Sequence, residues 1–279
     1  MKLAGVVVWY NPTLEDIENI KSYIKEVDKL YIIDNTEGDS NIDKIKDPKI
    51  EYIFKNENMG IASALNMACN MAIDSGYKYI LTMDQDSRFK KDDLKKLIDM
   101  ASANDLSNVG IVSPWHKTKL KVEKPSEKIS YPLDVMTSGN IVNLEIYKKI
   151  GGFKDFLFID GVDIEYCLNL KKNNYKVMQI NDVDLEHDLG DIFYRKFLWK
   201  EFMCDNHNYI RVYYMCRNYR YIRDTYKSIA PEFCSVLVKI KGLIFKIIFF
   251  ENDKIKKLKS IHLGIKDYRK GKYGKKKWR

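Results

Sequence analysis

Short apolar runs alternate with longer amphipathic stretches along the first third of the chain. The apolar runs, rich in Val, Ile and Tyr, cover residues 3–9, 30–33, 50–54 and 77–83. The stretch 14–27 has helical character, and in 61–74 the apolar residues fall on one helical face. This alternation predicts an α/β fold with a doubly wound, mostly parallel sheet, whose ligands bind beyond the carboxyl ends of the strands.

The pattern continues less regularly through the middle of the chain. It predicts a helix over 92–101, strands over 109–113 and 133–143, and a helix over 162–172, with a polar loop at 116–130. The segment 192–224 is crowded with aromatic residues and arginines. We expect it to be helical and to cover the sheet or the site.

An unusually apolar helix is predicted from about residue 231 to 250. Its polar positions form one narrow stripe of Glu232, Ser235, Lys239, Gly242 and Lys246. The lysines interrupt the segment too often for a membrane span, which needs about 20 predominantly apolar residues. They suit a helix lying in the membrane interface. Packing on the body of the protein or in a dimer interface is the alternative left open.

The charge of the chain is concentrated near its carboxyl end. The 279 residues carry a net charge of +9, but residues 239–279 hold 15 Lys and Arg against 3 Asp and Glu. Residues 1–238 are close to neutral, with 33 basic and 36 acidic residues. A basic tail suits phosphate-bearing partners, either anionic lipid or nucleic acid, although a merely solvated charged end has the same composition.

Cysteine usage and the amino-terminal residues bear on the compartment. The five cysteines are widely spaced and form no CxxC pair, which is typical of reduced thiols. The first apolar run is too short for a signal peptide and no small-residue cleavage site follows it. We therefore expect a cytoplasmic protein.

The stretch YILTMDQDSRF, residues 79–89, carries two acids at the end of a predicted buried strand. Carboxylates at Asp84 and Asp86 could together hold Mg²⁺ or Mn²⁺, because these cations prefer oxygen ligands. Such a cation could in turn bind a diphosphate. The alternative is an acidic turn in which one aspartate caps a following helix.

A series of motifs in fixed order resembles a known family. The motifs are WYNP (9–12), IIDN (32–35), NENMGIASALN (56–66), MDQDS (83–87), SGNIV (138–142), GGF (151–153) and FIDGVDIEYCLN (158–169). Their order resembles that of inverting family-2 glycosyltransferases with the GT-A fold. FIDGVDIEYCLN, HDLG (187–190), the pair Arg217–Asn218 and GIKDYRKGKYGK (264–275) are similar to bacterial rhamnosyltransferases that build surface polysaccharides.

The resemblance implies a domain organisation and a reaction. A GT-A domain would cover residues 1–228, with a nucleotide-binding half of about 1–115 and an acceptor half of about 116–228. Residues 229–279 would form a helical basic segment that binds membrane or dimerises. An acceptor hydroxyl would attack the anomeric carbon of a nucleotide-activated sugar, opposite the departing diphosphate. This displacement needs a base and a positive charge beside the diphosphate.

The implied substrates follow from the same relatives. The donor would be dTDP-rhamnose, and the acceptor a polyprenyl-diphosphate-linked saccharide. The enzyme would be bound peripherally to the anionic inner face of the cell membrane. A UDP-hexose donor, in a glucosyl or galactosyl transferase, is the alternative on the same fold. The sequence leaves open the linkage and the oligomeric state, including a homodimer.

The family's metal and diphosphate residues carry over to positions in this chain. The resemblance places Mn²⁺ or Mg²⁺ on Asp84 and Asp86, with His187 completing the metal or diphosphate site. A structural histidine in a loop is the other reading of His187. Arg217 would touch the diphosphate, or would instead pair with Asp224 or another surface acid.

The catalytic base is implied at the head of the helix 162–172. Asp163 matches the second acid of the family's pair, while Val162 stands where a glutamate is commoner, so Asp160 would substitute in part. Both acids have a structural alternative. Asp160 fits a helix N-cap, and an acid in the first turn favours the helix dipole.

The resemblance also implies the nucleotide contacts. Asp34 would contact the base or ribose, and Asn11 and Pro12 would shape the neighbouring loop. Asn58 and Gly60 precede a predicted helix whose free N–H groups could face polar ligand atoms. A plain Asn cap is the alternative at that helix start.

Two rival classes fit the residues less well. A nucleotidyltransferase on a related fold would be expected to carry a glycine-rich phosphate loop after the first strand, and WYNPTLED contains no glycine. A nucleic-acid-binding module would account for the basic tail but leaves the acidic pair unexplained. We therefore expect no nucleic-acid partner.

Overall fold

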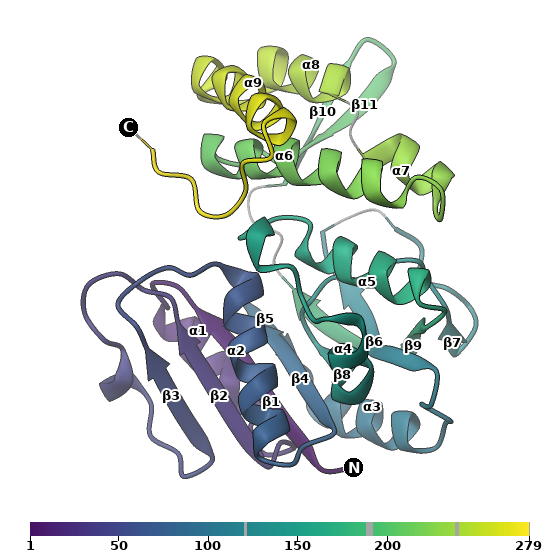
Figure 1. The fold of residues 1–279 in the computed structure, drawn as a ribbon. Coiled ribbons are helices and arrows are strands. Elements are labelled where there is room, and N and C mark those ends of the chain that lie inside the picture. Colours follow the sequence, from purple (N-terminus) through teal and green to yellow (C-terminus); the bar gives the residue numbers. More distant parts are fainter. Residues whose placement is uncertain (120–121, 188–191, 238–239, 279) are drawn as a thin grey trace.

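A mixed sheet of nine strands forms the body of the protein (Figure 1), in a computed structural model that describes residues 1–119, 122–187, 192–237 and 240–278. Its strand order is β3-β2-β1-β4-β8-β6-β9-β5, and β7 pairs with β9. The strands are β1 (Leu3–Trp9), β2 (Lys29–Asp34), β3 (Ile50–Phe54), β4 (Tyr79–Asp84), β5 (Ser87–Phe89), β6 (Val109–Lys117), β7 (Ile129–Ser130), β8 (Asn140–Asn143) and β9 (Lys176–His187).

The first four strands in the order are parallel and end level with one another. In the register, Trp9 of β1 lies beside Asp34 of β2, and Val8 lies beside Asp84 of β4. The second half is mixed, because β8 runs antiparallel to β4 and β6 while β6 and β9 are parallel. Polar residues that end these strands therefore gather at one edge, as the α/β pattern predicts.

Helices cover both faces of the sheet and form a further layer beyond its carboxyl edge (Figure 1). The elements that flank the sheet are α1 (Leu14–Asn19), η1 (Ile20–Ser22), η2 (Ile42–Lys44), α2 (Ile61–Asp74), α3 (Asp93–Ser102), α4 (Leu144–Ile150), η3 (Asp155–Leu157) and α5 (Val162–Lys172). The further layer contains β10 (Phe193–Phe197), β11 (Lys200–Cys204), α6 (Tyr209–Tyr226), α7 (Pro231–Leu237), α8 (Ile240–Phe250) and α9 (Lys254–Arg269).

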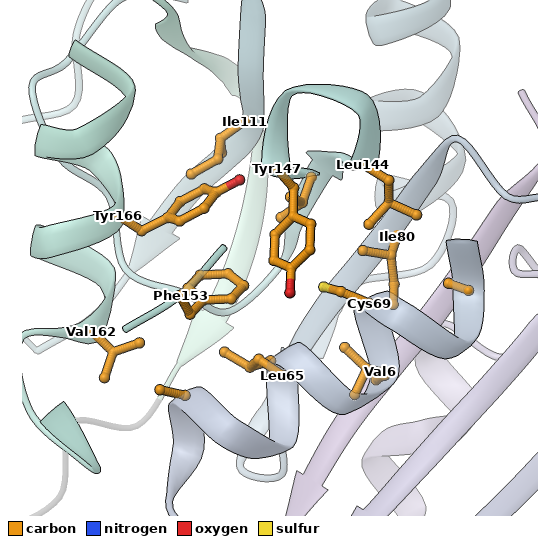
Figure 2. Close-up of a cluster of buried hydrophobic side chains, with 14 of the residues drawn as sticks. Val6, Leu65, Cys69, Ile80, Ile111, Leu144, Tyr147, Phe153, Val162 and Tyr166 are labelled. Atoms are coloured by element: carbon orange, nitrogen blue, oxygen red, sulfur yellow. The ribbon is translucent and has the colours of Figure 1, made fainter. Parts of the chain in front are cut away.

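The core between α2, α4 and α5 (Figure 2) fixes the start of residues 153–163, which form the acid-bearing loop that carries Asp160 and Asp163. Tyr147, Phe153 and Tyr166 are buried, and the rings of Phe153 and Tyr166 lie 4.3 Å apart. Asn66 of α2 donates to the Phe153 carbonyl at 2.8 Å and accepts from its N–H at 3.0 Å. Two of the sequence motifs, NENMGIASALN and GGF, thus meet in one hydrogen-bonded contact.

The carboxyl-terminal segment packs back on α6. Tyr213 of α6 donates to Asp267 at 2.8 Å, and Lys276 donates from its backbone N–H to Tyr214 at 2.7 Å. A buried ion pair joins Lys257 to Glu251 at 2.9 Å. Removing the carboxyl-terminal segment would expose the apolar side chains of α6 that it covers. Deleting it would therefore disturb the fold as well as any membrane or dimer contact that the segment makes.

The structure confirms the predicted fold class but corrects several predicted elements. The helix predicted over 14–27 is short, ending in a 3₁₀ turn at Ser22, and the strand predicted over 133–143 covers only Asn140–Asn143. The segment 192–224 is helical only from Tyr209, because strands over residues 193–197 and 200–204 form a hairpin. The helix predicted over 231–250 consists of α7 and α8, and its residues 238–239 lie outside the described part.

Candidate active site

The acidic pair lies at the turn between β4 and β5. Asp84 is the last residue of β4, and Asp86 immediately precedes β5. The residue between them, Gln85, accepts from the Tyr10 N–H at 2.7 Å and donates to Asp16 at 3.2 Å. Gln85 thereby ties the turn to the loop after β1. Neither acid caps a helix, so the capping alternative for this pair is wrong.

His187 completes a group of three potential ligands. It ends β9 and lies opposite Ser87 in the antiparallel register of β5 and β9. Its Nδ1 is 2.5 Å from Ser87 Oγ and 3.4 Å from Asp86 Oδ1. One ligand atom each from Asp84, Asp86 and His187 lie within 4.8 Å of one another. The metal residues implied by the resemblance are thus brought together by three strand ends.

This donor set fits a divalent cation. Burial is the main cause that raises the pKa of Asp84 to about 6, and the neighbouring Asp86 carboxylate raises it further, while His187 and Arg211 lower it. A carboxylate in that position is stabilised in its charged form by a positive ion beside it. Two carboxylates and an imidazole suit Mn²⁺ or Mg²⁺, with the nitrogen favouring Mn²⁺. Asp84, Asp86 and His187 are therefore the residues that would hold such an ion.

Two residues outside the acidic pair hold its backbone in place. The Asp84 N–H donates to Ser138 Oγ at 3.0 Å. His116 Nε2 donates to the Ser138 carbonyl at 2.7 Å. Burial lowers the pKa of His116 to about 4, so this imidazole is neutral at physiological pH. Ser138 belongs to the SGNIV motif, whose position at a strand end is explained by this support of Asp84.

Asp163 is close enough to Asp84 for that charge to affect its pKa, but it is not one of the three potential metal ligands. It lies in the first turn of α5, where its Oδ1 accepts from the Ile164 N–H at 2.8 Å. Burial is the main cause that raises its pKa to about 6, although the Ile164 N–H lowers it, and the charges of Asp134, Asp84 and Asp160 add to the rise. A carboxylate whose pKa is raised toward neutrality is a stronger proton acceptor, as a general base requires.

Asp160 is paired with arginine and does not cap α5. Arg211 of α6 donates to it from Nε at 3.1 Å and from Nη2 at 2.6 Å, and the Asp160 side chain is only 3% exposed. The N-cap position of α5 is Gly161, which makes no side-chain cap. The capping alternative for Asp160 is therefore wrong, because its carboxylate points to the guanidinium of α6.

The loop that carries these acids has strained backbone. Phe158 and Asp160, neither of them glycine, have φ of 69° and 64°, and Gly161 follows at 80°. Such conformations cost roughly 1–3 kcal/mol each in residues with a Cβ and persist only where neighbours hold them. The neighbours that hold this loop lie on α6.

The pair Arg217–Asn218 clamps this loop. Asn218 is fully buried and donates through Nδ2 to the carbonyls of Leu157, Ile159 and Asp160 at 2.8–2.9 Å. Arg217 is 1% exposed and donates to four acceptors, the carbonyls of Phe156, Leu157 and Gly274 and the side chain of Asn218.

These bonds correct the sequence interpretation of Arg217. A contact with the diphosphate would require its bonds to the protein to break, and the alternative pair with Asp224 is wrong because Asp224 bonds Arg223 at 2.9 Å. The guanidinium instead connects the acid-bearing loop with the carboxyl-terminal residues. Sequence position could not reveal this, because its acceptors are backbone carbonyls about 60 residues away.

Replacing Asn218 should loosen the loop and slow the sugar transfer that the sequence resemblance implies. Asn218→Ala leaves three buried carbonyls without this donor, which should cost about 1–3 kcal/mol of unfolding free energy. We expect kcat to fall at least ten-fold with the donor KM little changed, because the loop carries Asp163 and not the metal group. Urea unfolding and steady-state kinetics measure both effects. Asn173→Ala, on an exposed helix end, is the matched control, and equal effects in both variants would refute the positioning role.

On the nucleotide side, Asp34 organises the loop after β2. It is fully buried and accepts from the Thr36 N–H at 2.9 Å, from Asn41 at 2.8 Å and from the Tyr52 hydroxyl at 2.5 Å. Burial alone would raise its pKa, but these hydrogen bonds outweigh it and the pKa is lowered. Asp34 is ionised and already surrounded by donors, so its direct effect here is on loop shape.

Asn11 and Pro12 follow β1, and Asn11 is bonded to the loop after β2. The Asn11 N–H donates to Thr36 Oγ1 at 2.8 Å, joining the loops after β1 and β2. Asn11 is exposed with φ of 49°, and Pro12 is buried beneath it. Asn11 thus ties the loop after β1 to the loop after β2. That the two residues shape a nucleotide site stays a prediction.

The start of α2 differs from the expectation of free N–H groups. Asn58 Oδ1 accepts from the Gly60 N–H at 3.0 Å, so Asn58 makes a turn and Gly60 is the N-cap. The first helical N–H, that of Ile61, donates to the Phe158 carbonyl at 2.8 Å. A Cβ on Gly60 would lie 2.6 Å from that carbonyl oxygen, so only glycine allows this approach. Gly60 therefore seats the acid-bearing loop on α2.

A cavity of about 350 Å³ opens beside the metal group. It is bordered by Asp86 and His187, and Arg88 and Lys117 contribute positive charge to its lining. Arg88 is paired with Glu186 at 2.8 Å. A cavity with carboxylates for a cation on one wall and basic residues on another suits a phosphorylated ligand.

Sequence reasoning missed Arg211, Ser138, His116 and Asp134 at this site. Arg211 was one of many basic residues in 192–224, and nothing local marks it as the partner of an acid 51 residues earlier. Ser138 was visible only as part of SGNIV. His116 begins a polar stretch in the sequence, but the structure extends β6 to Lys117 and so carries His116 into the buried edge of the site.

The raised pKa of Asp163 predicts a stability effect. The folded state keeps this acid protonated up to about pH 6, whereas the unfolded chain ionises it at the ordinary pKa of 3.8. Stability is therefore lost as the pH rises from about 4 to about 6 and stays lost above pH 6, while below pH 4 the carboxyl has no effect. At about 1.4 kcal/mol per pH unit, the cost is at most about 3 kcal/mol. Asp163→Asn should therefore raise the melting temperature at pH 8, with the gain vanishing at pH 4.

Differential scanning calorimetry at both pH values measures this gain. Asp39→Asn, at an exposed position, is the matched control and should leave the melting temperature nearly unchanged. A variant at position 163 that is no more stable than wild type at pH 8 would show that the carboxylate is not strained by burial.

Comparison with known proteins adds a family match. The model described as glycosyl transferase family 2 matches residues 12–167, which is more than half of the chain. A dTDP-rhamnosyl transferase RfbF of Shigella flexneri is 27% identical over 205 residues, covering 67% of this chain and 69% of the relative. The low-salt glycan biosynthesis hexosyltransferase Agl10 of Haloferax volcanii is 22% identical over 209 residues, covering 67% of each.

Solved structures show the same fold at low identity. A structure of Staphylococcus aureus TarS 1–349 in complex with UDP-GlcNAc superposes with a TM-score of 0.56 and 13% identity, covering 98% of this chain and 93% of that one. GalNAc-T7 with UDP, GalNAc and Mn²⁺ gives a TM-score of 0.56 and 10% identity, covering 97% and 57%. These similarities concern the fold, and the fold places strand ends where the acids of this chain gather.

Proposed function

Because the chain belongs to glycosyl transferase family 2 and is a glycosyltransferase of GT-A type, we propose that it transfers rhamnose from dTDP-rhamnose with inversion. The acceptor is a hydroxyl of a polyprenyl-diphosphate-linked saccharide, met at the inner face of the cell membrane. The observation that carries the proposal is the group of Asp84, Asp86 and His187 beside a separate buried acid, Asp163.

The two parts of the site divide the work of the displacement. Asp84, Asp86 and His187 would hold Mn²⁺ or Mg²⁺, and the bound cation would supply positive charge beside the nucleoside diphosphate. Asp163 accepts the proton of the acceptor hydroxyl, and its raised pKa suits that task near pH 7. Asp160 keeps Arg211 beside Asp163 and fixes the loop, and so acts through position.

The two halves of the GT-A domain bind different substrates. Residues 1–115, with the loops of Asn11 and Asp34, face the nucleotide, and residues 116–228 face the acceptor. Residues 229–279 form the helical basic segment that packs on α6 and contributes to membrane binding. The name of the Shigella relative supports the dTDP-rhamnose donor.

A UDP-hexose is the second candidate donor. The hexosyltransferase name of the Haloferax relative favours it, as does the UDP-GlcNAc complex with the same fold. The two candidates are separated by turnover of dTDP-rhamnose, UDP-glucose and UDP-galactose with Mn²⁺ and a detergent-solubilised lipid-linked saccharide. We expect turnover with dTDP-rhamnose to exceed the others at least 100-fold, with inverted anomeric configuration in the product by NMR. Preferential turnover of a UDP-hexose would replace the first donor by the second.

A further inference from the structure

The hairpin of β10 and β11 ends in an unusual pair of turn residues. Phe197 pairs with Lys200, so Leu198 and Trp199 alone form the turn. Leu198 is 73% exposed and Trp199 is 91% exposed. Two-residue hairpin turns ordinarily carry Gly, Asn or Asp, because their backbone requires positive φ and their side chains face water. Here the two turn positions hold large apolar side chains.

The backbone of this turn is strained by the residue it uses. Leu198 has φ of 54°, in the left-handed region that glycine adopts without cost. A glycine at this position would relieve the strain and remove an exposed apolar side chain. Neither folding nor solubility favours leucine followed by tryptophan here, so their presence indicates that the tip contacts something apolar.

The tip continues into an apolar surface on α8. Phe197 lies 5.4 Å from both Phe245 and Phe249 of α8, measured between ring centroids, and Phe202 of β11 lies 5.0 Å from Phe245. The outer members of this aromatic layer remain open, with Phe249 53% exposed and Ile248 42% exposed. Figure 1 shows the hairpin beside α8 in the layer farthest from the sheet.

Basic side chains outnumber acidic ones around this surface, where Glu201 lies opposite Lys196 in the hairpin register and Asp253 is exposed beside Lys254. Arg195 and Lys196 are exposed on the hairpin itself. Lys241 is exposed on α8, and Lys254 and Lys256 are exposed at the start of α9. Apolar side chains at the centre and basic side chains around them are the arrangement of proteins that lie in the interface of an anionic bilayer.

We propose that the hairpin tip, Leu198 and Trp199, and the outer face of α8 form a docking surface that inserts into an anionic lipid bilayer. No helix among the described residues is long and apolar enough to cross a membrane, so the contact is in the interface plane. The tip places a tryptophan at headgroup depth, where its amphipathic ring is stable. The inference rests on the proposed function only in supplying a reason for the contact, the lipid-linked acceptor.

A second copy of the chain fits this surface less well than a bilayer does. In a two-fold dimer the same patch meets itself, which would bring Arg195 and Lys196 of one copy toward those of the other. Like charges in such a contact are costly. A narrow protruding turn also buries little area against the same turn of a second copy, whereas a bilayer surrounds it.

The test uses the full-length protein with vesicles and needs no donor or acceptor. Flotation compares vesicles of phosphatidylcholine with vesicles that contain 30% phosphatidylglycerol, a composition chosen as about that of an anionic membrane. The decisive variant is Leu198→Gly, Trp199→Ser, because glycine at the first turn position suits the hairpin and should preserve the fold. Tyr131→Ser is the matched control, an aromatic residue 58% exposed outside this surface.

We expect wild type and the Tyr131 variant to bind the anionic vesicles and the turn variant to bind at least ten-fold more weakly. Trp199→Phe should keep most of the binding but lose the blue shift in tryptophan emission that vesicles cause. Arg195→Glu with Lys196→Glu should weaken binding to anionic vesicles, in contrast to Lys148→Glu with Lys149→Glu, which changes the same charge on exposed residues of α4.

Three outcomes would overturn the proposal. Wild type could fail to bind vesicles, the turn variant could bind as tightly as wild type, or sedimentation could show a dimer that only the turn variant loses. Transfer to a detergent-solubilised acceptor is measured in the same variants. Retained transfer with lost vesicle binding supports the docking surface, and absent transfer in wild type would count against the proposed function alone.

Discussion

Asp163→Asn is expected to reduce sugar transfer by about 10³-fold while donor binding stays nearly unchanged. Positioned general bases typically contribute 10²–10⁴-fold, and this carboxylate has the burial and the raised pKa that the role requires. An amide of the same shape keeps the hydrogen bond from the Ile164 N–H but cannot accept the proton. Single-turnover kinetics measure transfer, and calorimetric titration with the nucleoside diphosphate measures binding.

The pH dependence of kcat tests the same role of Asp163. The base is active when ionised, so kcat should rise as pH increases through about 6 and level off above pH 7. Asp134→Asn is the informative control, because the Asp134 charge contributes to raising the pKa of Asp163. It should keep most of the turnover and move the midpoint to lower pH. If Asp134→Asn abolished turnover and Asp163→Asn did not, the two acids would exchange roles.

The second large effect is expected from the strand-end acids. Asp84→Asn combined with Asp86→Asn should abolish metal-dependent binding of dTDP and lower transfer by about 10³-fold, because amides cannot neutralise a divalent cation. The fold should survive, since burial already disfavours the charge of Asp84 and its replacement removes that cost.

Thermal shift measures this loss, because a ligand that binds only the folded state raises its stability. Wild type should be stabilised by dTDP with Mn²⁺ and much less by either alone. Asp39→Asn with Asp43→Asn removes two exposed acids elsewhere and should behave as wild type. An undiminished shift in the Asp84, Asp86 variant would remove the acids from the metal site.

The fold could be predicted because its signals are local. Parallel strands buried on both faces give continuous apolar runs, as in LAGVVVW of β1, and the polar residue after each run marks the carboxyl edge. Asp84 was located this way, whereas Asp34 came from the family resemblance, and the register places both strand ends at the same edge. The helix of Asp163 was predicted at its observed bounds, Val162–Lys172.

What could not be predicted depends on contacts distant in sequence. The Arg211–Asp160 pair and the three bonds of Asn218 join α6 to a loop about 50–60 residues earlier, and no periodicity encodes such partners. The hairpin was mistaken for helix because its aromatic and basic residues are compatible with either structure over so short a span. Its turn has none of the usual turn residues, so the strongest local signal of a hairpin is missing.

The most direct test of the account is a crystal structure with dTDP and Mn²⁺, in which anomalous scattering locates the metal. We expect one manganese coordinated by Asp86 and His187, with Asp84 adjacent, and the diphosphate bound to the metal on the side of the cavity lined by Arg88 and Lys117. Nucleotide bound elsewhere, or bound there with no manganese near the acids, would contradict the account.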